Sequence, residues 1–262
     1  MKKIALITGG SSGLGFAFAE LLGKENYKIL ILARNPEKIG NSVQKLIDQN
    51  MEAEGFACDV SDPTQVQQVS DTIKSKYNTI DFLILNAGVV TPKLLSEYTD
   101  IQDIKNDIDI DLMGHIYSTY YFTPLLVSGS KILMISSGFG LVGSAGYSIY
   151  CAAKAGVVNF AESIRRELLC KNIQVYVACP GDMDTPQFEY EISHQAEWMK
   201  QSSPRKVMPV KKAAAKILNQ CKGKYKFLIL IGSEIKLLNA VNKMLPRKMR
   251  EWLVDTMLPR PK

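Results

Sequence analysis

Residues that commonly build metal centres are few in this chain. Its 262 residues include only two histidines and five cysteines, and no cysteines stand in CxxC or Cys/His spacing. We therefore expect no metal site. An odd number of cysteines without a recognisable secretory signal indicates free thiols in a reducing compartment, which predicts a cytoplasmic location. No apolar run approaches the ~18 residues that a membrane-spanning helix needs.

Excess positive charge is also scarce, except near the C-terminus. The formal net charge is +6, and residues 232–262 hold seven Lys/Arg against three Asp/Glu. The rest of the chain is close to balanced, which argues against nucleic acid as a partner. The length and a hydrophobic content of 46% are typical of one globular domain with a sizeable core. We assign residues 1–232 to that domain and residues 233–262 to a C-terminal extension.

Short apolar segments alternate with helical patterns along residues 1–232. This alternation predicts an α/β fold with a doubly wound, parallel, seven-stranded sheet, the Rossmann fold. In such a sheet, ligands bind at the carboxyl ends of the strands. The expected strands are 3–8, 28–33, 55–58, 81–85, 130–135, 173–178 and 226–231. Helices are expected at 16–23, 36–49, 63–77, 101–124, 150–168 and 211–221.

A glycine-rich segment joins the first expected strand to the first expected helix. Glycines there permit a tight turn that brings the backbone close to a pyrophosphate, and the helix N-terminus adds N–H groups and a positive dipole. The alternative is a plain Gly/Ser turn, but the strand-turn-helix context favours dinucleotide binding. The candidate binding residues are Gly9, Ser11, Ser12, Gly13, Leu14 and Gly15.

The end of the second expected strand indicates which dinucleotide binds. A site for NAD usually carries an acid here for the ribose 2′-hydroxyl, whereas this chain has Ala33 followed by Arg34. A guanidinium is suited to pair with a 2′-phosphate, so the sequence favours NADP(H). The alternative is a solvated surface arginine. Other candidate cofactor residues at strand ends are Asp59, which is expected to meet the adenine amino group, and Val60, Asn86, Ala87 and Gly88.

A hydroxyl, a phenol and an ammonium follow the fifth expected strand. Ser137 precedes Tyr150 by thirteen residues, and Lys154 follows Tyr150 by four, which places the last two on one helical face. A nearby positive charge lowers the pKa of a phenol, here from about 10 toward about 7, where it is useful as a proton donor to a carbonyl. Ser137 is expected to donate a hydrogen bond to the same oxygen. The alternative is an ordinary amphipathic pair.

Four motifs together resemble the short-chain dehydrogenase/reductase family. TGGSSGLG at 8–15, NAG at 86–88, Ser137 with YCAAK at 150–154, and PG at 180–181 match its pattern in order and spacing. The resemblance covers about residues 3–231 and implies an oxidoreductase that transfers a hydride between nicotinamide and a ketone or secondary alcohol. It implies that Tyr150 is the acid/base, that Lys154 tunes it and anchors the ribose, and that Ser137 binds the carbonyl. Further implied cofactor residues are Pro180, Gly181 and Thr185.

This chain departs from the family pattern at one position. The family also suggests an expected oligomeric state. The family usually has an asparagine, whose backbone carbonyl orders a water to the lysine, where this chain has Asp111. Asp111 either keeps that backbone role, which is our prediction, or places its carboxylate beside Lys154 and blunts its effect on Tyr150. In this family, helices at 101–127 and 149–169 usually form a homodimer or homotetramer.

The substrate is suggested by shorter signals. Residues 33–35 together with 180–189 look most like the 3-ketodihydrosphingosine reductase branch, which reduces a long-chain keto-amine with NADPH. The alternatives are a generic ketone reductase with another small-molecule substrate and a non-catalytic NADP-binding sensor. The polar segment 187–209 is either a substrate lid or a surface excursion.

The C-terminal extension combines apolar and basic residues at helical spacing. It is either an amphipathic segment on an anionic membrane surface, which would make the protein peripheral to the membrane, or a packing element that closes the substrate cleft. The apolar residues are Ile235, Leu237, Leu238, Val241 and Leu245, then, after a break at Pro246, Trp252, Leu253, Met257 and Leu258.

Overall fold

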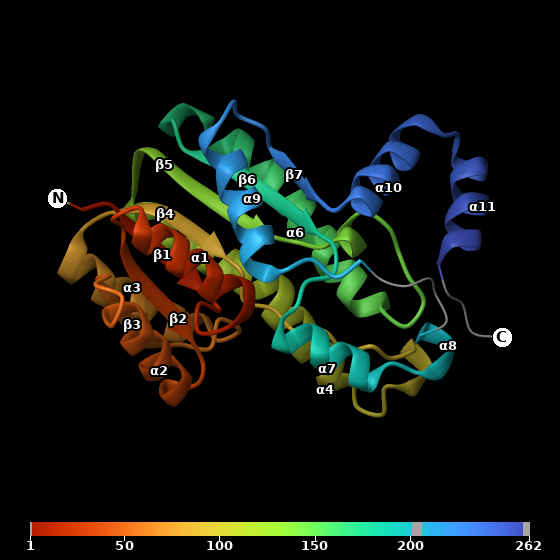
Figure 1. The fold of residues 1–262 in the computed structure, drawn as a ribbon, viewed down its shortest axis with the longest axis horizontal. Helices are drawn as coiled ribbons and strands as arrows, with labels where there is room; N and C mark the ends of the chain where they lie inside the picture. Colours follow the sequence, from red (N-terminus) through yellow and green to blue (C-terminus); the bar gives the residue numbers. More distant parts are fainter. Residues whose placement is uncertain (1, 201–205, 259–262) are drawn as a thin grey trace.

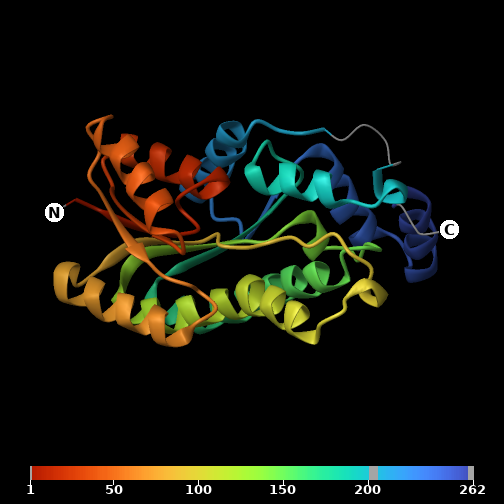
Figure 2. The same ribbon diagram turned by 90° about the horizontal axis from the view of Figure 1, so that it is seen from below.

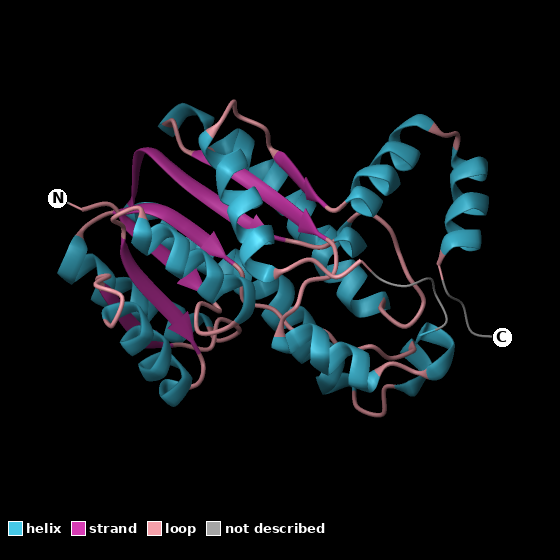
Figure 3. Cartoon of the chain, in the orientation of Figure 1, coloured by secondary structure: helices cyan, strands magenta, loops and turns pink. Residues whose placement is uncertain are grey.

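Seven parallel strands form the centre of the molecule (Figure 1, Figure 3). The structure is a computed structural model that describes residues 2–200 and 206–258. Residues 201–205 of the expected lid and residues 259–262 of the tail therefore lie outside the described residues. The strand order β3-β2-β1-β4-β5-β6-β7 confirms the predicted doubly wound sheet. The strands are β1 (Ile4–Thr8), β2 (Lys28–Ala33), β3 (Ala53–Ala57), β4 (Ile80–Leu85), β5 (Leu126–Ile135), β6 (Gln174–Pro180) and β7 (Leu228–Ile231).

Helices cover both faces of the sheet, as the edge-on view in Figure 2 shows. Successive residues of a strand point to opposite faces, so Ile7 joins one apolar core and Leu6 the other. Both faces of the sheet are buried against apolar residues, which explains why the strands read as continuous apolar runs. One layer comprises α1 (Gly13–Lys24), α2 (Pro36–Ile47) and α9 (Val210–Lys222), and the other α3 (Pro63–Tyr77), α5 (Gly114–Phe122) and α6 (Ser148–Glu167).

Some element boundaries differ from the expected ones. Helix α1 begins at Gly13 rather than residue 16, so the glycine turn runs directly into the first helical turn. Strand β5 begins at Leu126 rather than residue 130, because Leu126 pairs with Ile80 before a register shift. Strand β3 is Ala53–Ala57, two residues earlier than expected at its start, because Ala53 pairs with Ile29 on β2.

The expected long helix over residues 101–124 is interrupted. It consists of α4 (Ile101–Ile108), a π-helical turn (Asp109–Met113) and α5, followed by a 3-10 turn (Thr123–Leu125). A π turn inserts one extra residue per turn and redirects the side chains that it carries. Here it carries Asp111, which is buried.

The segments after β6 and β7 fold into helices beside the carboxyl ends of the strands (Figure 1). They are α7 (Pro186–His194), α8 (Glu197–Lys200), α10 (Ser233–Met244) and α11 (Arg247–Met257). Short 3-10 turns lie at Leu95–Glu97, Gly138–Gly140 and Leu169–Lys171. Across the described part of the chain, we find no helix with both the length and the apolar character to cross a bilayer.

Candidate active site

Two adjoining cavities lie where the carboxyl ends of the strands meet the glycine turn. The larger has a volume of about 370 Å³ and the smaller of about 200 Å³. They share Gly9, Ser12, Ala87 and Gly88 as lining residues, so they form one continuous site. Of the residues predicted for this site, Gly15 and Asp111 line neither cavity and lie behind the wall.

The glycine turn is tight enough to exclude side chains. Gly9 and Gly13 have positive φ angles of 64° and 52°, which favour glycine. A Cβ atom on Gly15 would lie 2.3 Å from the carbonyl oxygen of Gly9 and 2.6 Å from Asn86 Nδ2. The turn thus presents backbone rather than side chains to the site, at the N-terminus of the twelve-residue helix α1. That arrangement fits a pyrophosphate.

Asn86 and Thr8 hold the end of β4 against this turn. Asn86 Nδ2 donates hydrogen bonds to the carbonyl oxygens of Thr8 (3.1 Å) and Gly9 (3.3 Å). The Thr8 hydroxyl oxygen accepts hydrogen bonds from the backbone N–H groups of Asn86 (2.9 Å) and Ala87 (3.1 Å). The Asn86 side chain therefore shapes the cradle. Thr8 was not among the predicted site residues, although a hydroxyl at the end of a buried strand beside a glycine turn was a signal for it.

The smaller cavity contains the groups expected to select the cofactor. It is lined by Arg34, Asp59, Val60 and Ser11, all of which were predicted. The exposed Lys38 also lines it and was not predicted. Arg34 is also exposed, so two cations border this end of the site. Asp59 Oδ1 accepts hydrogen bonds from the N–H (3.0 Å) and the hydroxyl (2.7 Å) of Ser61, so this oxygen already stabilises its own turn.

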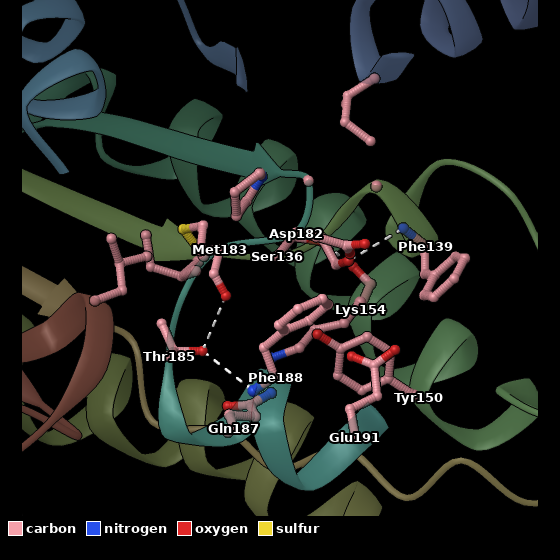
Figure 4. Close-up of a pocket in the computed structure, with 18 of the residues that line it drawn as sticks. Ser136, Phe139, Tyr150, Lys154, Asp182, Met183, Thr185, Gln187, Phe188 and Glu191 are labelled. Carbon is pink, nitrogen blue, oxygen red and sulfur yellow. Dashed lines mark hydrogen bonds between the residues drawn. The ribbon is translucent and has the colours of Figure 1, made fainter. Parts of the chain in front are cut away.

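The larger cavity brings Ser137, Tyr150 and Lys154 together. Figure 4 shows Tyr150 and Lys154 among the residues that line it. Ser137 follows β5 and caps the 3-10 turn, its hydroxyl oxygen accepting a hydrogen bond from the Phe139 N–H at 3.2 Å. The Lys154 ammonium lies 5.4 Å from the centre of the Tyr150 ring, as the four-residue helical spacing predicts. The neighbouring Ser136 hydroxyl donates to the Lys154 carbonyl oxygen at 2.8 Å and so ties α6 to β5.

The acidity of Tyr150 differs from the expectation. We expected Lys154 to lower the pKa of the phenol toward neutrality. In the structure the pKa of Tyr150 is raised well above its usual value, chiefly by burial and secondly by the negative charge of Asp111. Hydrogen bonding with Ser137 acts in the opposite direction. The physical reason is first that burial removes solvent from the phenolate, and second that the negative charge of Asp111 repels it.

Asp111 contacts Lys154 through its side chain, from behind the cavity wall. Its Oδ1 atom lies 3.4 Å from Lys154 Nζ and accepts a hydrogen bond from the Val89 N–H at 2.8 Å. Only 1% of Asp111 is exposed. This contact corresponds to our alternative, in which the carboxylate lies beside Lys154, and the backbone role of Asp111 stays a prediction.

The far wall of the larger cavity comes from α7 and from the tail. Helix α7 begins at Pro186 after Thr185, whose hydroxyl oxygen accepts the Phe188 N–H at 3.2 Å. The lining residues also include the other implied cofactor residues, Pro180 and Gly181. From α7 come Pro186, Gln187, Phe188 and Glu191, and from the tail Glu234, Ile235, Leu238, Val254 and Leu258. Of the described residues of segment 187–209, Gln187, Phe188 and Glu191 line the site.

The tail packs on its own subunit at several points. Ile235 is buried with Cys179 and Leu230, and a Cβ atom on Gly138 would lie 2.4 Å from its Cδ1. Asn242 Nδ2 donates a hydrogen bond to the Leu141 carbonyl oxygen at 2.6 Å. These contacts belong to the packing alternative for the tail. They leave the membrane alternative untested.

Comparisons with known proteins agree with this geometry. The sequence pattern described as short chain dehydrogenase matches residues 3–196. Carbonyl reductase family member 4 of Danio rerio is 32% identical over 186 residues, covering 71% of this chain and 77% of that protein. A 3-oxoacyl-(acyl-carrier-protein) reductase of Chlamydia trachomatis is 33% identical over 205 residues, covering 76% and 82%.

The chain belongs to the short-chain dehydrogenase family. It is therefore an oxidoreductase of that family. Solved members share the fold: a short chain dehydrogenase from Burkholderia cenocepacia in complex with NADP has a TM-score of 0.80 at 23% identity, covering 89% of this chain and 98% of that one. One from Burkholderia phymatum in complex with NAD has a TM-score of 0.82 at 21% identity, covering 100% and 97%. The predicted family is confirmed, and the 3-ketodihydrosphingosine reductase branch stays a prediction.

A second polar cluster near the short-chain dehydrogenase site escaped the sequence analysis. Glu191 on α7 accepts a hydrogen bond from the Tyr147 hydroxyl at 2.6 Å and another from Gln195 Nε2 at 2.9 Å. Tyr147 stands at the N-terminus of α6, and its ring lies 4.7 Å from that of Phe139. The cluster joins α7 to the helix that carries Tyr150. No motif links residues 44 positions apart, so only the fold reveals it.

Proposed function

We propose that this short-chain dehydrogenase reduces a ketone to a secondary alcohol with NADPH. The observation that carries the proposal is the convergence of Ser137, Tyr150 and Lys154 in one cavity that opens into the glycine cradle. The cradle fits a dinucleotide because its close backbone approach and positive φ angles suit a pyrophosphate. A reduced nicotinamide bound there supplies the hydride that becomes the new C–H bond, and is oxidised as the ketone is reduced.

The chain supplies the proton and the orientation. The Ser137 hydroxyl donates a hydrogen bond to the carbonyl oxygen and fixes its position. The Tyr150 hydroxyl donates its proton to the same oxygen, which completes the alcohol. The phenolate left behind recovers a proton from solvent. A high pKa keeps Tyr150 protonated at neutral pH, and this state suits a proton donor in the reductive direction.

Two cations support NADPH rather than NADH as the partner. Arg34 and Lys38 border the smaller cavity at the end of β2, and Ala33 stands where an acid would repel a 2′-phosphate. A structural neighbour in complex with NADP and another in complex with NAD show that the fold itself accepts either cofactor. The choice between them therefore depends on the side chains of this cavity.

The walls of the larger cavity support a substrate with a long apolar chain. Leu238, Val254 and Leu258 come from the tail and face a wall that includes Phe139 and Phe188. Apolar surface of this kind favours an alkyl or acyl chain over a small polar ketone. A long-chain lipid ketone, 3-ketodihydrosphingosine among them, is our proposed substrate class. A generic ketone reductase of shorter substrates is the alternative.

A substrate panel with the purified protein tests the proposal. NADPH oxidation is followed with ketones of increasing chain length, with and without an amino group beside the carbonyl. We expect turnover that rises with chain length and is faster with NADPH than with NADH. If no ketone is reduced although NADPH binds, the protein is a cofactor-binding sensor. If short ketones are the best substrates, the long-chain assignment is wrong.

A further inference from the structure

Asp111 and Lys154 form a buried ion pair behind the wall of the site. The two side chains are 1% and 4% exposed, and Lys154 Nζ lies 3.4 Å from Asp111 Oδ1. Asp111 Oδ2 is buried without a hydrogen-bond partner among the described residues. A Cβ atom on Gly88 would meet both groups, 2.7 Å from Oδ1 and 3.0 Å from Nζ, so the β4 loop presses on the pair. The carboxylate thus has little freedom to turn away from the lysine.

The other groups around this pair leave Lys154 as its only nearby cation in the described structure. From α4, Asp107 adds negative charge that raises the pKa of Asp111. From α5, His115 lies buried, with Nε2 3.1 Å from the Leu85 carbonyl oxygen. Burial and Lys154 lower its pKa to about 3, so it is neutral at working pH. From α6, Tyr150 faces the pair, and from the β4 loop the Val89 N–H donates to Asp111.

The Lys154 ammonium stabilises a Tyr150 phenolate only to the extent that no nearby negative charge offsets it. A carboxylate 3.4 Å from the ammonium offsets most of its field at Tyr150. The carboxylate also repels a phenolate directly. Both effects favour the protonated phenol, and both would vanish with an amide at position 111.

We propose that Asp111 is a positioning residue that holds the Lys154 ammonium and thereby keeps Tyr150 protonated, so that the proton donor for ketone reduction is retained to higher pH. The proposal rests on the proposed function of Tyr150 as the proton donor. It adds to that function the pH range over which the proton donor stays protonated, set by one residue of this chain. Burial raises the pKa of Asp111, whereas the Lys154 ammonium and the Val89 N–H lower it and so favour the carboxylate.

The direct test is the titration of Tyr150 in the protein without cofactor. Tyrosine labelled with ¹³C at Cζ reports the protonation of each phenol by NMR, and Tyr150→Phe identifies the Tyr150 resonance. In Asp111→Asn we expect the Tyr150 titration to begin at least about one pH unit lower than in the natural protein. Asp111→Ser, which keeps an acceptor for the Val89 N–H but removes the charge, serves if the amide variant does not fold. Unchanged titration in a folded variant overturns the proposal.

A matched control separates this effect from a general change of charge. Asp109 lies two residues away in the same π turn but pairs with Lys105 at the surface. Asp109→Asn should leave the Tyr150 titration where it is, and an equal shift in that variant would contradict a specific role for Asp111. In kinetics, Asp111→Asn should move the alkaline limb of the reduction profile to lower pH and increase alcohol oxidation at a given pH.

The proposal and the function on which it rests fail in different ways. If Tyr150→Phe retains turnover, Tyr150 is not the proton donor and the proposed function fails, whatever the NMR titration shows. If Tyr150→Phe is inactive and Asp111→Asn leaves both the titration and the pH profile unchanged, only the role of Asp111 is wrong.

Discussion

The two adjoining cavities of this short-chain dehydrogenase are built from different materials. The smaller cavity and the glycine cradle consist of strand ends and short loops. Backbone groups and the side chains of Asn86 and Thr8 set their shape. The larger cavity consists of Ser137 and Tyr150 on one side and three helices from the last third of the chain on the other. A shape set by backbone tolerates few changes. A cavity wall made of side chains permits many substitutions. We therefore infer that cofactor binding is the fixed property of the protein, and that substrate choice is the property that substitutions can adjust.

Removing the Tyr150 hydroxyl should separate the two cavities most sharply. Tyr150→Phe deletes only the proton donor, so turnover should fall by about 10²-fold or more while NADPH binds as before. Steady-state kinetics and calorimetry measure the two quantities on one preparation. Near-natural turnover would remove Tyr150 from the mechanism.

Arg34 tests the cofactor side alone. Arg34→Ala should weaken NADPH binding by about 1.5–3 kcal/mol, which is typical for a charged hydrogen bond, and leave NADH binding unchanged. Calorimetry with both cofactors provides the comparison. If both are weakened equally, Arg34 has a structural role and the choice of NADPH has another source.

Gly15 tests whether backbone sets the cradle. Gly15→Ala places a Cβ atom 2.3 Å from the Gly9 carbonyl oxygen, so the free energy of unfolding should fall by about 1–3 kcal/mol and cofactor affinity should fall with it. Gly40→Ala is the matched control, because a Cβ atom there meets nothing within 4 Å and it lies inside helix α2. That control should be neutral or stabilising by about 0.5–1 kcal/mol. Chemical denaturation distinguishes the two variants, and equal stability would show that the cradle has room.

Leu238 tests the adjustable side. Leu238→Ala should lower kcat/KM for long-chain ketones by roughly threefold to tenfold, because lost apolar contact costs about 0.8 kcal/mol per CH₂ group, and leave short ketones unaffected. Leu237→Ala, on the outer face of the same helix with Leu237 56% exposed, is the control. If both variants lose equally, the tail does not select the chain length.

The outer face of the tail leads to the prediction with the smallest effect. Leu237, Met244, Met249 and Trp252 are exposed there, alongside the basic residues Lys236, Lys243 and Lys248. Such a face suits an anionic membrane surface. Cosedimentation with anionic vesicles should be weak, should decline at high salt because exposed charges are screened beyond about 8 Å at physiological ionic strength, and should disappear without the tail. No sedimentation at low salt would leave the tail as a packing element only.

The sequence predicted what depends on backbone and local spacing. Gly9 and Gly13 follow from the strand-turn-helix pattern, and the contact between Lys154 and Tyr150 follows from helical spacing. The raised pKa of Tyr150 was not predicted, chiefly because residue spacing does not show how deeply the phenol is buried. The contact of Asp111 with Lys154 was only one of two alternatives, because the π turn that carries Asp111 is not revealed by apolar periodicity. Glu191 and Tyr147 were missed for a similar reason, since only tertiary packing brings α7 to α6.

The tail shows a middle case. Its apolar spacing predicted a helical face, with a second apolar cluster after the break at Pro246, and the structure has helices α10 and α11 there. The same spacing did not indicate which residues face the site, because an apolar stripe only shows that some surface is covered. Leu238 lines the cavity while Leu237 faces outward. That distinction depends on the orientation of α10, whose residue Ile235 packs against Leu230 of β7 and against Gly138 of the 3-10 turn.

One measurement tests the central claim most directly, namely that the smaller cavity with its glycine cradle and the larger cavity act as one site for ketone reduction. NADPH deuterated at the transferable position of the nicotinamide is mixed with the natural protein and the best ketone of the panel, and the product is analysed by mass spectrometry and NMR. Our account predicts one deuterium on the carbon that carried the carbonyl, with a proton from water on the oxygen. An alcohol without that deuterium, or no alcohol from any ketone while NADPH remains bound, would contradict it.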